Sequence, residues 1–325
     1  MGVTPAALRF PYGRVVLPRT RLAYIHLRNL LSDAKRDRAG RITGYVAVSL
    51  LDELVIFYLV RGEVATATVR AAGGAQPIAI ASALEKIPHE PEYGEICFHE
   101  ADEQQLACMF ATHASAPEPW PEGMAPHDPA ALFPFLMATT FDGMIEIVAN
   151  ENVNYLLFQN GAVARTFLTS APHGTVVDRV AKLFSREGRM GELQVSRWAV
   201  PAPLPVQAPP ALVLAYRELS TALVQRLVDE GRADAPAVAE QTRLNLTAAH
   251  PELVGFSAVG APVHDPITDV PALTSGVAAW IRELLWNALD HERTPPEAVF
   301  RELTWARRHL YQSAGLFDHM PWKVV

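Results

Sequence analysis

The chain has 325 residues, half of them hydrophobic and 19% charged, with a formal net charge of −7. This length exceeds one average domain, and this composition excludes an intrinsically disordered chain. Two cysteines, Cys97 and Cys108, are too few for a disulfide framework. The most apolar stretch, 45–60, contains Asp52 and Glu53 and is too short to cross a bilayer. We therefore expect a cytoplasmic protein of two or three domains, without a membrane span.

The N-terminal residues 1–41 are basic, although the whole chain is acidic. They hold nine Lys and Arg residues against two Asp residues, so the rest of the chain carries a net charge of −14. This asymmetry indicates that the basic segment contacts an acidic partner surface, a phosphate-bearing ligand or the chain's own acidic half. The alternative is a helix face that is simply solvated. If a partner binds here, Arg28, Arg36 and Arg38 are the candidate contact residues.

Two proline-rich stretches divide the chain. Residues 116–130 and 201–210 contain five prolines each, and proline stiffens the backbone and removes a hydrogen-bond donor. We interpret both as linkers. The sequence therefore predicts three domains, at 1–115, 130–200 and 211–325.

The first two blocks contain an internal repeat with an offset of 99 residues. Gly44 precedes Gly62 by 18 residues, and Gly143 precedes Gly161 by the same spacing. Further along, the register is expected to slip by two residues, so that 94–98 matches 191–195. The closing Gly-Glu pair of each copy supports this alignment.

Each copy is predicted to form a leading helix, a three-stranded antiparallel meander, a second helix and a closing strand. Asn160-Gly161 favours a tight type I′ hairpin turn, and Arg61-Gly62 takes that place in the first copy. The leading helices are expected at 22–31 and 130–138. Pro77 fits the first turn of the second helix of its copy. The apolar positions of the second helices are Ile80, Leu84 and Ile87, then Val176, Val177, Val180 and Phe184.

The fold class is thus α+β, with two tandem units. Apolar residues occupy both faces of the predicted strands at 55–60 and 153–158. One face is needed for the unit's own helices, so the other face must meet the sister unit, the helical block or a partner. We expect the two units to pack on one another and to leave the arginine-rich leading segment exposed.

These features resemble the PATAN domain, also called DUF4388. The matching stretches are FPYGRVVLPRTRLAYIHLRNLL (10–31), Gly44, YLVRGEVATA (58–67) and EYGEICF (92–98). The second copy retains LFQNGAVART (157–166), with Thr166 where the first has Ala67. The resemblance covers about half of the chain and rests on glycines and apolar spacing. It implies an interaction module of bacterial signalling, with no cofactor and no known catalytic centre.

The third block is predicted to be helical. One amphipathic helix carries Leu212, Ala215, Leu219, Leu223 and Leu227, and another carries Val277, Trp280, Ile281, Leu284 and Ala288. Residues 294–297, TPPE, read as a capping box that opens a third helix through Leu310. The aromatic tail 317–322 is expected to pack on this bundle. We recognise no family in this region.

Two residue sets could carry chemistry. Cys97, His99, Cys108 and His113 are soft ligands that suit zinc, but their spacing is not that of a zinc finger or ribbon. We therefore expect a small buried cysteine at Cys108 and no bound metal. Ser257 lies in GFSAVG, whose glycines are one residue too far apart for a nucleophile elbow.

Three classes of function thus compete: a non-enzymatic regulatory adaptor that binds protein partners, a metal-dependent or serine hydrolase, and a nucleic-acid-binding protein. The pI near 5.9 disfavours the last, because phosphate contacts need positive charge. No motif has the spacing that the second requires. We favour the adaptor and leave its partner, its oligomeric state and the role of the helical region open.

Overall fold

The computed structural model describes residues 7–36, 41–88, 90–169, 174–185, 193–256, 265–288 and 295–322. The chain has an α+β fold with a C-terminal helical region, as predicted. It separates into two compact units. Unit 1 comprises Met1–Ile78 and Lys86–Leu204, and unit 2 comprises Ala79–Glu85 and Pro205–Val325. Both predicted α+β repeats thus lie in unit 1, where the sequence suggested separate domains at 1–115 and 130–200.

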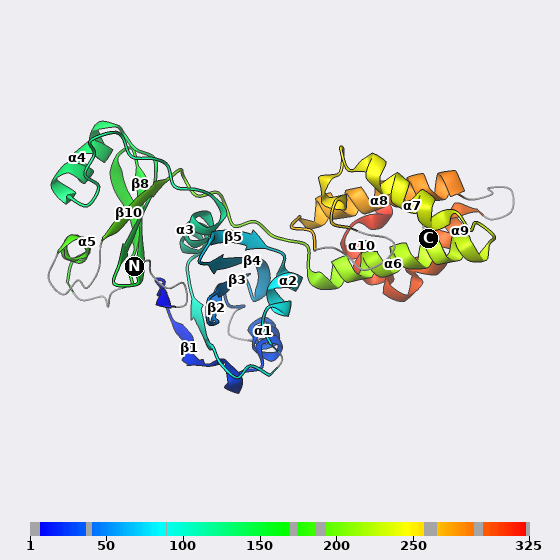
Figure 1. Ribbon diagram of the computed structural model, residues 1–325, viewed down its shortest axis with the longest axis horizontal. Helices are drawn as coiled ribbons and strands as arrows, with labels where there is room; N and C mark the ends of the chain where they lie inside the picture. The colour runs from blue at the N-terminus through cyan, green and yellow to red at the C-terminus, as the bar shows by residue number, and fades with distance from the viewer. Residues whose placement is uncertain are drawn as a thin grey trace. The chain divides into compact units, whose positions relative to one another are not determined.

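The first repeat forms a six-stranded antiparallel sheet in the order β1-β6-β2-β3-β4-β5 (Figure 1). Its strands are β1 (Val15–Arg21), β2 (Gly44–Ser49), β3 (Leu54–Val60), β4 (Glu63–Ala71), β5 (Gly74–Ile78) and β6 (Glu95–Glu100). The second repeat forms a four-stranded sheet in the order β10-β7-β8-β9. Its strands are β7 (Gly143–Ala149), β8 (Asn152–Gln159), β9 (Ala162–Phe167) and β10 (Gln194–Trp198). The strand order β6-β2-β3-β4 recurs as β10-β7-β8-β9, as the repeat requires.

The two sheets also share their register. The β3–β4 pairing shifts between Tyr58 and Leu59, and the β8–β9 pairing shifts between Leu157 and Phe158, which are 99 residues further on. The hairpin turns match as well. Arg61 and Gly62 have positive φ, as do Asn160 and Gly161. The glycine N–H donates to the carbonyl of Ile42 (2.7 Å) in the first turn and of Phe141 (3.0 Å) in the second.

The predicted two-residue slip is wrong. Tyr45 pairs with His99 and Met144 pairs with Trp198, so the closing strands keep the offset of 99. A Cβ on Gly44 would lie 2.0 Å from the His99 carbonyl oxygen, and one on Gly143 would lie 2.4 Å from that of Trp198. Close backbone contact with the closing strand therefore fixes the register. The Gly-Glu pair on which the predicted slip rested is Gly94-Glu95 in the first copy, at the start of the closing strand β6. The matching pair of the second copy, 191–192, lies outside the described residues.

Unit 1 contains four α-helices among its described residues. They are α1 (Leu27–Arg36), α3 (Glu103–Ala114), α4 (Pro129–Ala138) and α5 (Val176–Phe184). Leu106, Cys108 and Met109 of α3 share one hydrophobic cluster with Tyr45 and Tyr58 of the first sheet and with Met144 and Tyr155 of the second. The two repeats therefore pack on one another, as expected. The other face of the second sheet packs against α4 and α5 through Leu132, Leu136 and Phe184 (Figure 1).

Three local predictions in the repeats need correction. Pro77 lies in β5, opposite Thr68, where the edge of a sheet tolerates a residue without an N–H. The expected helix at 22–31 is a 3-10 turn, η2 (Leu22–Tyr24), followed by α1, because Ile25 is extended. Val176 and Val177 are exposed, since only the later turns of α5 contact the core.

The helix expected after β5 is α2 (Ile80–Glu85), which belongs to unit 2 rather than to its own repeat. The Ile80 N–H donates to Gln207 Oε1 at 3.1 Å, so this short helix is held by the chain that leads into the helical region.

The remainder of unit 2 is helical. Its elements are α6 (Pro210–Asp229), α7 (Ala235–Leu246), η3 (Pro251–Leu253), α8 (Val270–Ala288), α9 (Pro296–Thr304), η4 (Trp305–Arg307), α10 (Arg308–Ser313) and η5 (Leu316–His319). The third predicted helix ends at Thr304 rather than at Leu310, and Thr294 of its expected capping box lies outside the described residues. Phe317 and Trp322 pack against Phe300, as expected for the tail. None of the helices in the described ranges is long and apolar enough to cross a membrane.

Candidate functional site at the junction of the two repeats

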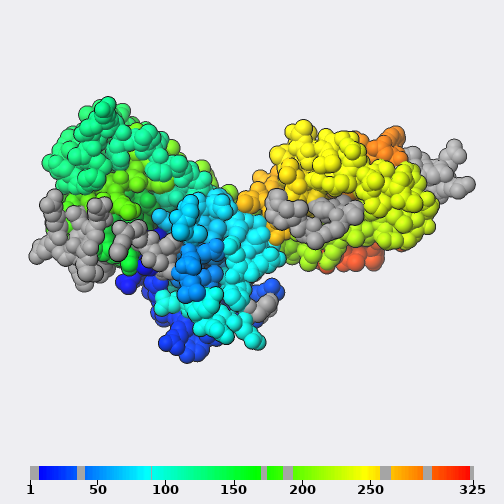
Figure 2. Space-filling view, viewed as in Figure 1, coloured from blue at the N-terminus to red at the C-terminus, as the bar shows by residue number. Residues whose placement is uncertain are grey.

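The N-terminal segment, residues 8–19, connects the two sheets of unit 1. Its first part lies beside β8: the Arg9 N–H donates to the Glu151 carbonyl (2.9 Å), and the Val153 N–H donates to the Arg9 carbonyl (2.8 Å). Its second part becomes β1 and pairs with β6. Figure 2 shows its dark blue atoms at the surface. Residues from both repeats therefore meet beneath one short stretch of chain.

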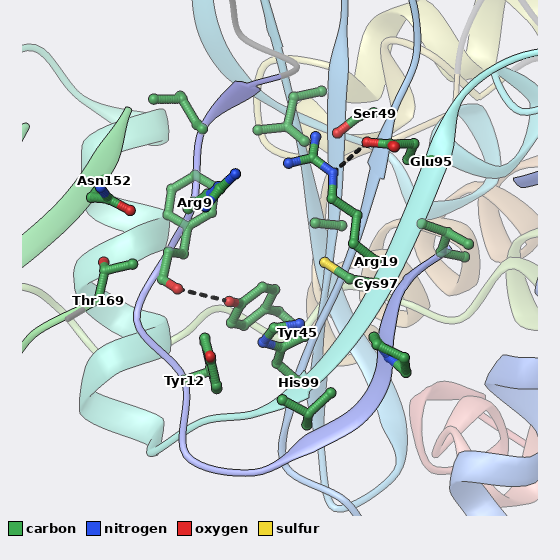
Figure 3. A pocket seen from close by; sticks show the side chains of 17 residues that line it. Arg9, Tyr12, Arg19, Tyr45, Ser49, Glu95, Cys97, His99, Asn152 and Thr169 are labelled. Atoms are coloured by element: carbon green, nitrogen blue, oxygen red, sulfur yellow. Dashed lines mark hydrogen bonds and ion pairs between the residues drawn. The ribbon is translucent and has the colours of Figure 1, made fainter. Parts of the chain in front are cut away.

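A cavity of about 440 Å³ lies beneath the N-terminal segment. Its floor is one face of the first sheet, because Tyr45, Ala47 and Ser49 alternate along β2. Glu95, Cys97 and His99 line it from the neighbouring strand β6. Asn152 and Thr169 line the cavity from the second repeat. Figure 3 shows the segment curving around the cavity, with Arg9 and Tyr12 on one arm and Arg19 on the other.

His99 is held in a fixed orientation in this cavity. Its ring stacks on Tyr45, with ring centroids 5.4 Å apart, and lies perpendicular to the ring of Tyr12, with centroids 4.4 Å apart. Burial lowers the pKa of His99, so its neutral form is favoured. The buried Nδ1 atom has no hydrogen-bond partner in the described part of the chain. His99 thus lines the cavity with its ring, while its Nδ1 atom is buried beside it without a partner among the residues that the structure describes.

The charged groups of the cavity are two arginines and one carboxylate. Arg19 forms an ion pair with Glu95. Arg9 is exposed and forms no ion pair within the described ranges. Burial raises the pKa of the Cys97 thiol, so this group is neutral at pH 7. The cavity walls therefore carry one net positive charge.

The structure separates the four residues considered as zinc ligands. Cys97 and His99 line the cavity, whereas Cys108 and His113 lie on α3 in the core between the repeats. No group of three or more potential ligands converges in the part of the chain that the structure describes. Cys108 is fully buried, as expected for a small core residue. Ser257 lies outside the described residues.

The core between the repeats contains a buried polar cluster that the sequence analysis missed. His113 Nδ1 lies 3.0 Å from the Tyr58 hydroxyl, and burial lowers the pKa of His113 to about 3. Burial also raises the pKa of Glu146, on β7, from 4.5 to about 7. Glu146 Oε1 has no hydrogen-bond partner among the described residues. The signal in the sequence was one Glu within the apolar run 143–149.

A second surface feature, the aromatic end of the first sheet, comprises Tyr24, Leu51 and Tyr93. These side chains are 72%, 66% and 51% exposed. They come from three separate stretches, which Gly94 brings together. The Leu22 N–H donates to the Gly94 carbonyl (3.0 Å), and a Cβ on Gly94 would lie 2.8 Å from the Ser49 carbonyl.

Of the three arginines expected to bind a partner, the structure describes one side chain. Arg28 is exposed on α1, which follows Tyr24 in the chain. Arg36 ends α1, but its side chain, like all of Arg38, lies outside the described residues.

Comparison with protein-family models, with curated proteins and with solved structures gives no match for this chain. The repeated α+β fold, the cavity and the exposed aromatic end are thus the basis for a functional proposal.

Proposed function

We propose that the protein is a non-enzymatic regulatory adaptor of bacterial signalling and that its tandem PATAN-like repeats bind a protein partner. The aromatic end of the first sheet carries this proposal. Exposed Tyr side chains are typical of binding hot spots, because they bury a large area at little entropic cost, and Arg is enriched at such sites as well. The resemblance of residues 10–98 to an interaction module supports the same function.

The stretches that form the aromatic end are held by backbone contacts with Gly94, so its side chains are presented without a large rearrangement. Preorganisation of this kind lowers the entropic cost of association. Tyr24, Leu51 and Tyr93 therefore offer an apolar centre to a partner, and Arg28 supplies a positive charge nearby in the chain. The matching partner surface is apolar at its centre and acidic at its rim.

Crosslinking tests the partner-binding surface. A photo-crosslinking amino acid at position 24 or 93, in full-length protein expressed in its native host, should capture one and the same protein. Trp305, which is 69% exposed in unit 2, is the control position and should not capture it. The double variant Tyr24→Ala, Tyr93→Ala should reduce recovery of that protein roughly tenfold or more, because hot-spot truncations cost this much. Capture from position 305 alone would contradict the proposal.

Charge reversal tests the basic segment. Replacing Arg28, Arg36 and Arg38 with Glu should weaken the complex and leave the fold intact, and raising the salt concentration should weaken the wild-type complex, because exposed charges are screened. Arg28→Glu alone can be compared with Arg301→Glu on α9, an exposed arginine of unit 2. Affinity of the triple variant equal to that of wild type at low and physiological salt would remove the basic segment from the interface.

A further inference from the structure

The cavity beneath the N-terminal segment has the properties of a small-molecule site. Its volume of about 440 Å³ lies within the range of such sites, roughly 300–1,000 Å³. Its walls come from the N-terminal segment and from both repeats, so a bound molecule would contact all three. It lies within unit 1.

The cavity offers an apolar surface to the body of a ligand. Leu8 and Phe10 of the N-terminal segment line it, together with Leu54 of β3 and Ile96 of β6. The ring of Tyr45 is held in place, because its hydroxyl donates to the carbonyls of Phe10 and Pro11 at 3.3 and 3.1 Å. A flat or short aliphatic group fits this surface, because contact with it removes apolar area from water.

The polar groups of the cavity favour an anion. Arg9 has no ion pair within the described ranges, whereas Arg19 is neutralised by Glu95. A guanidinium binds a carboxylate with two parallel hydrogen bonds, which makes such a pair strong and directional.

We propose that this cavity binds a small organic carboxylate, whose apolar body lies on Tyr45 and whose carboxylate pairs with Arg9. The stacked rings of Tyr45 and His99 form part of the surface on which this body lies. Binding ties the N-terminal segment to both repeats and thereby stabilises unit 1, because a ligand that binds only the folded state shifts the folding equilibrium. This site does not depend on the proposed protein partner.

Direct binding to the full-length protein tests the site. The probes are 3-phenylpropionate, its neutral analogue 3-phenylpropanamide, and inorganic phosphate, each titrated by calorimetry. We expect the carboxylate to bind at millimolar concentration or below and the amide to bind roughly tenfold more weakly or worse, since the charge-assisted pair is lost. Phosphate, which lacks an apolar body, should also bind more weakly than the carboxylate.

A matched pair of variants locates the binding. Arg9→Gln should weaken the carboxylate about tenfold, because it removes the charge but keeps an exposed polar side chain. Arg14→Gln is the control, since Arg14 lies on the same segment, pairs with Glu100 at 2.6 Å and does not line the cavity. This variant should bind the carboxylate as wild type does.

Cys97 provides an independent measure of occupancy. Its thiol lines the cavity, whereas Cys108 is buried in the core. 3-Phenylpropionate should slow the modification of Cys97 by methyl methanethiosulfonate in wild type but not in Arg9→Gln. Equal binding of acid and amide, equal binding of acid and phosphate, unchanged affinity in Arg9→Gln, or no protection of Cys97 would each overturn the proposal.

Discussion

Gly44→Ala should destabilise unit 1 strongly, by about 3 kcal/mol or more, because a side chain at this position forces the strands β2 and β6 apart. The new Cβ would lie 2.0 Å from the His99 carbonyl oxygen and 2.9 Å from the Glu100 Cα. Both are backbone atoms, which cannot move away without breaking the β2–β6 pairing. Gly143→Ala should have the same effect in the second repeat, where the Trp198 carbonyl oxygen lies 2.4 Å from the added carbon.

Gly73→Ala is the matched control for both variants. A Cβ at Gly73 has no neighbour within 4 Å, so this substitution should be nearly neutral. Urea unfolding of the full chain measures the loss of unfolding free energy. Amide hydrogen exchange in β2, β6, β7 and β10 then shows whether the loss occurs in the affected strands. Equal stability of Gly44→Ala and Gly73→Ala would show that the close strand contact does not fix the register of the repeat.

Glu146→Gln should change how the stability of unit 1 depends on pH. Burial raises the pKa of Glu146 to about 7, against the opposing charge of Arg70 and the hydrogen bond of Thr112. The folded state therefore prefers the protonated carboxyl. The cost of ionising it is absent below about pH 4.5, grows as the pH rises to about 7 and is constant above. Glutamine has no such cost.

Relative to wild type, the variant should therefore gain on the order of 2 kcal/mol in unfolding free energy between pH 4 and pH 8. The amide adds a contribution that does not depend on pH, so the change between the two pH values is the quantity to measure. The lowered pKa of His113, about 3, makes the unfolding free energy of unit 1 fall as the pH drops below about 6.5. This happens in wild type and variant alike, so it cancels in the comparison. The exposed Glu122→Gln is the control and should give no change. A difference that stays constant from pH 4 to pH 8 would contradict a buried, protonated Glu146.

The repeat could be predicted from the sequence alone, because the signals that define it are local. Positive φ at the second position of each hairpin turn favours glycine, as at Gly62 and Gly161. The apolar residues of each strand recur with the two-residue period of a β-strand. These requirements recur 99 residues apart, and the strands, the bulge and the turn recur with them. The amphipathic helices α6 and α8 were predictable for the same reason: their periodicity lies within one continuous stretch.

Which distant residues meet could not be predicted from the sequence, because it depends on how whole elements pack in the folded chain. Cys97 and His99 were visible in the sequence as two residues on one face of a strand, but Arg9, Asn152 and Thr169 reach the same cavity from up to 160 positions apart in the chain. The placement of Pro77 in an added edge strand and of α2 in unit 2 depended on pairing partners that no local pattern specifies. The buried state of Glu146 had the same origin, since its burial arises from the packing of α3 and the sister repeat against β7. Contacts of this kind depend on the close packing of whole elements. The local sequence specifies the residue on one side of such a contact but not its partner.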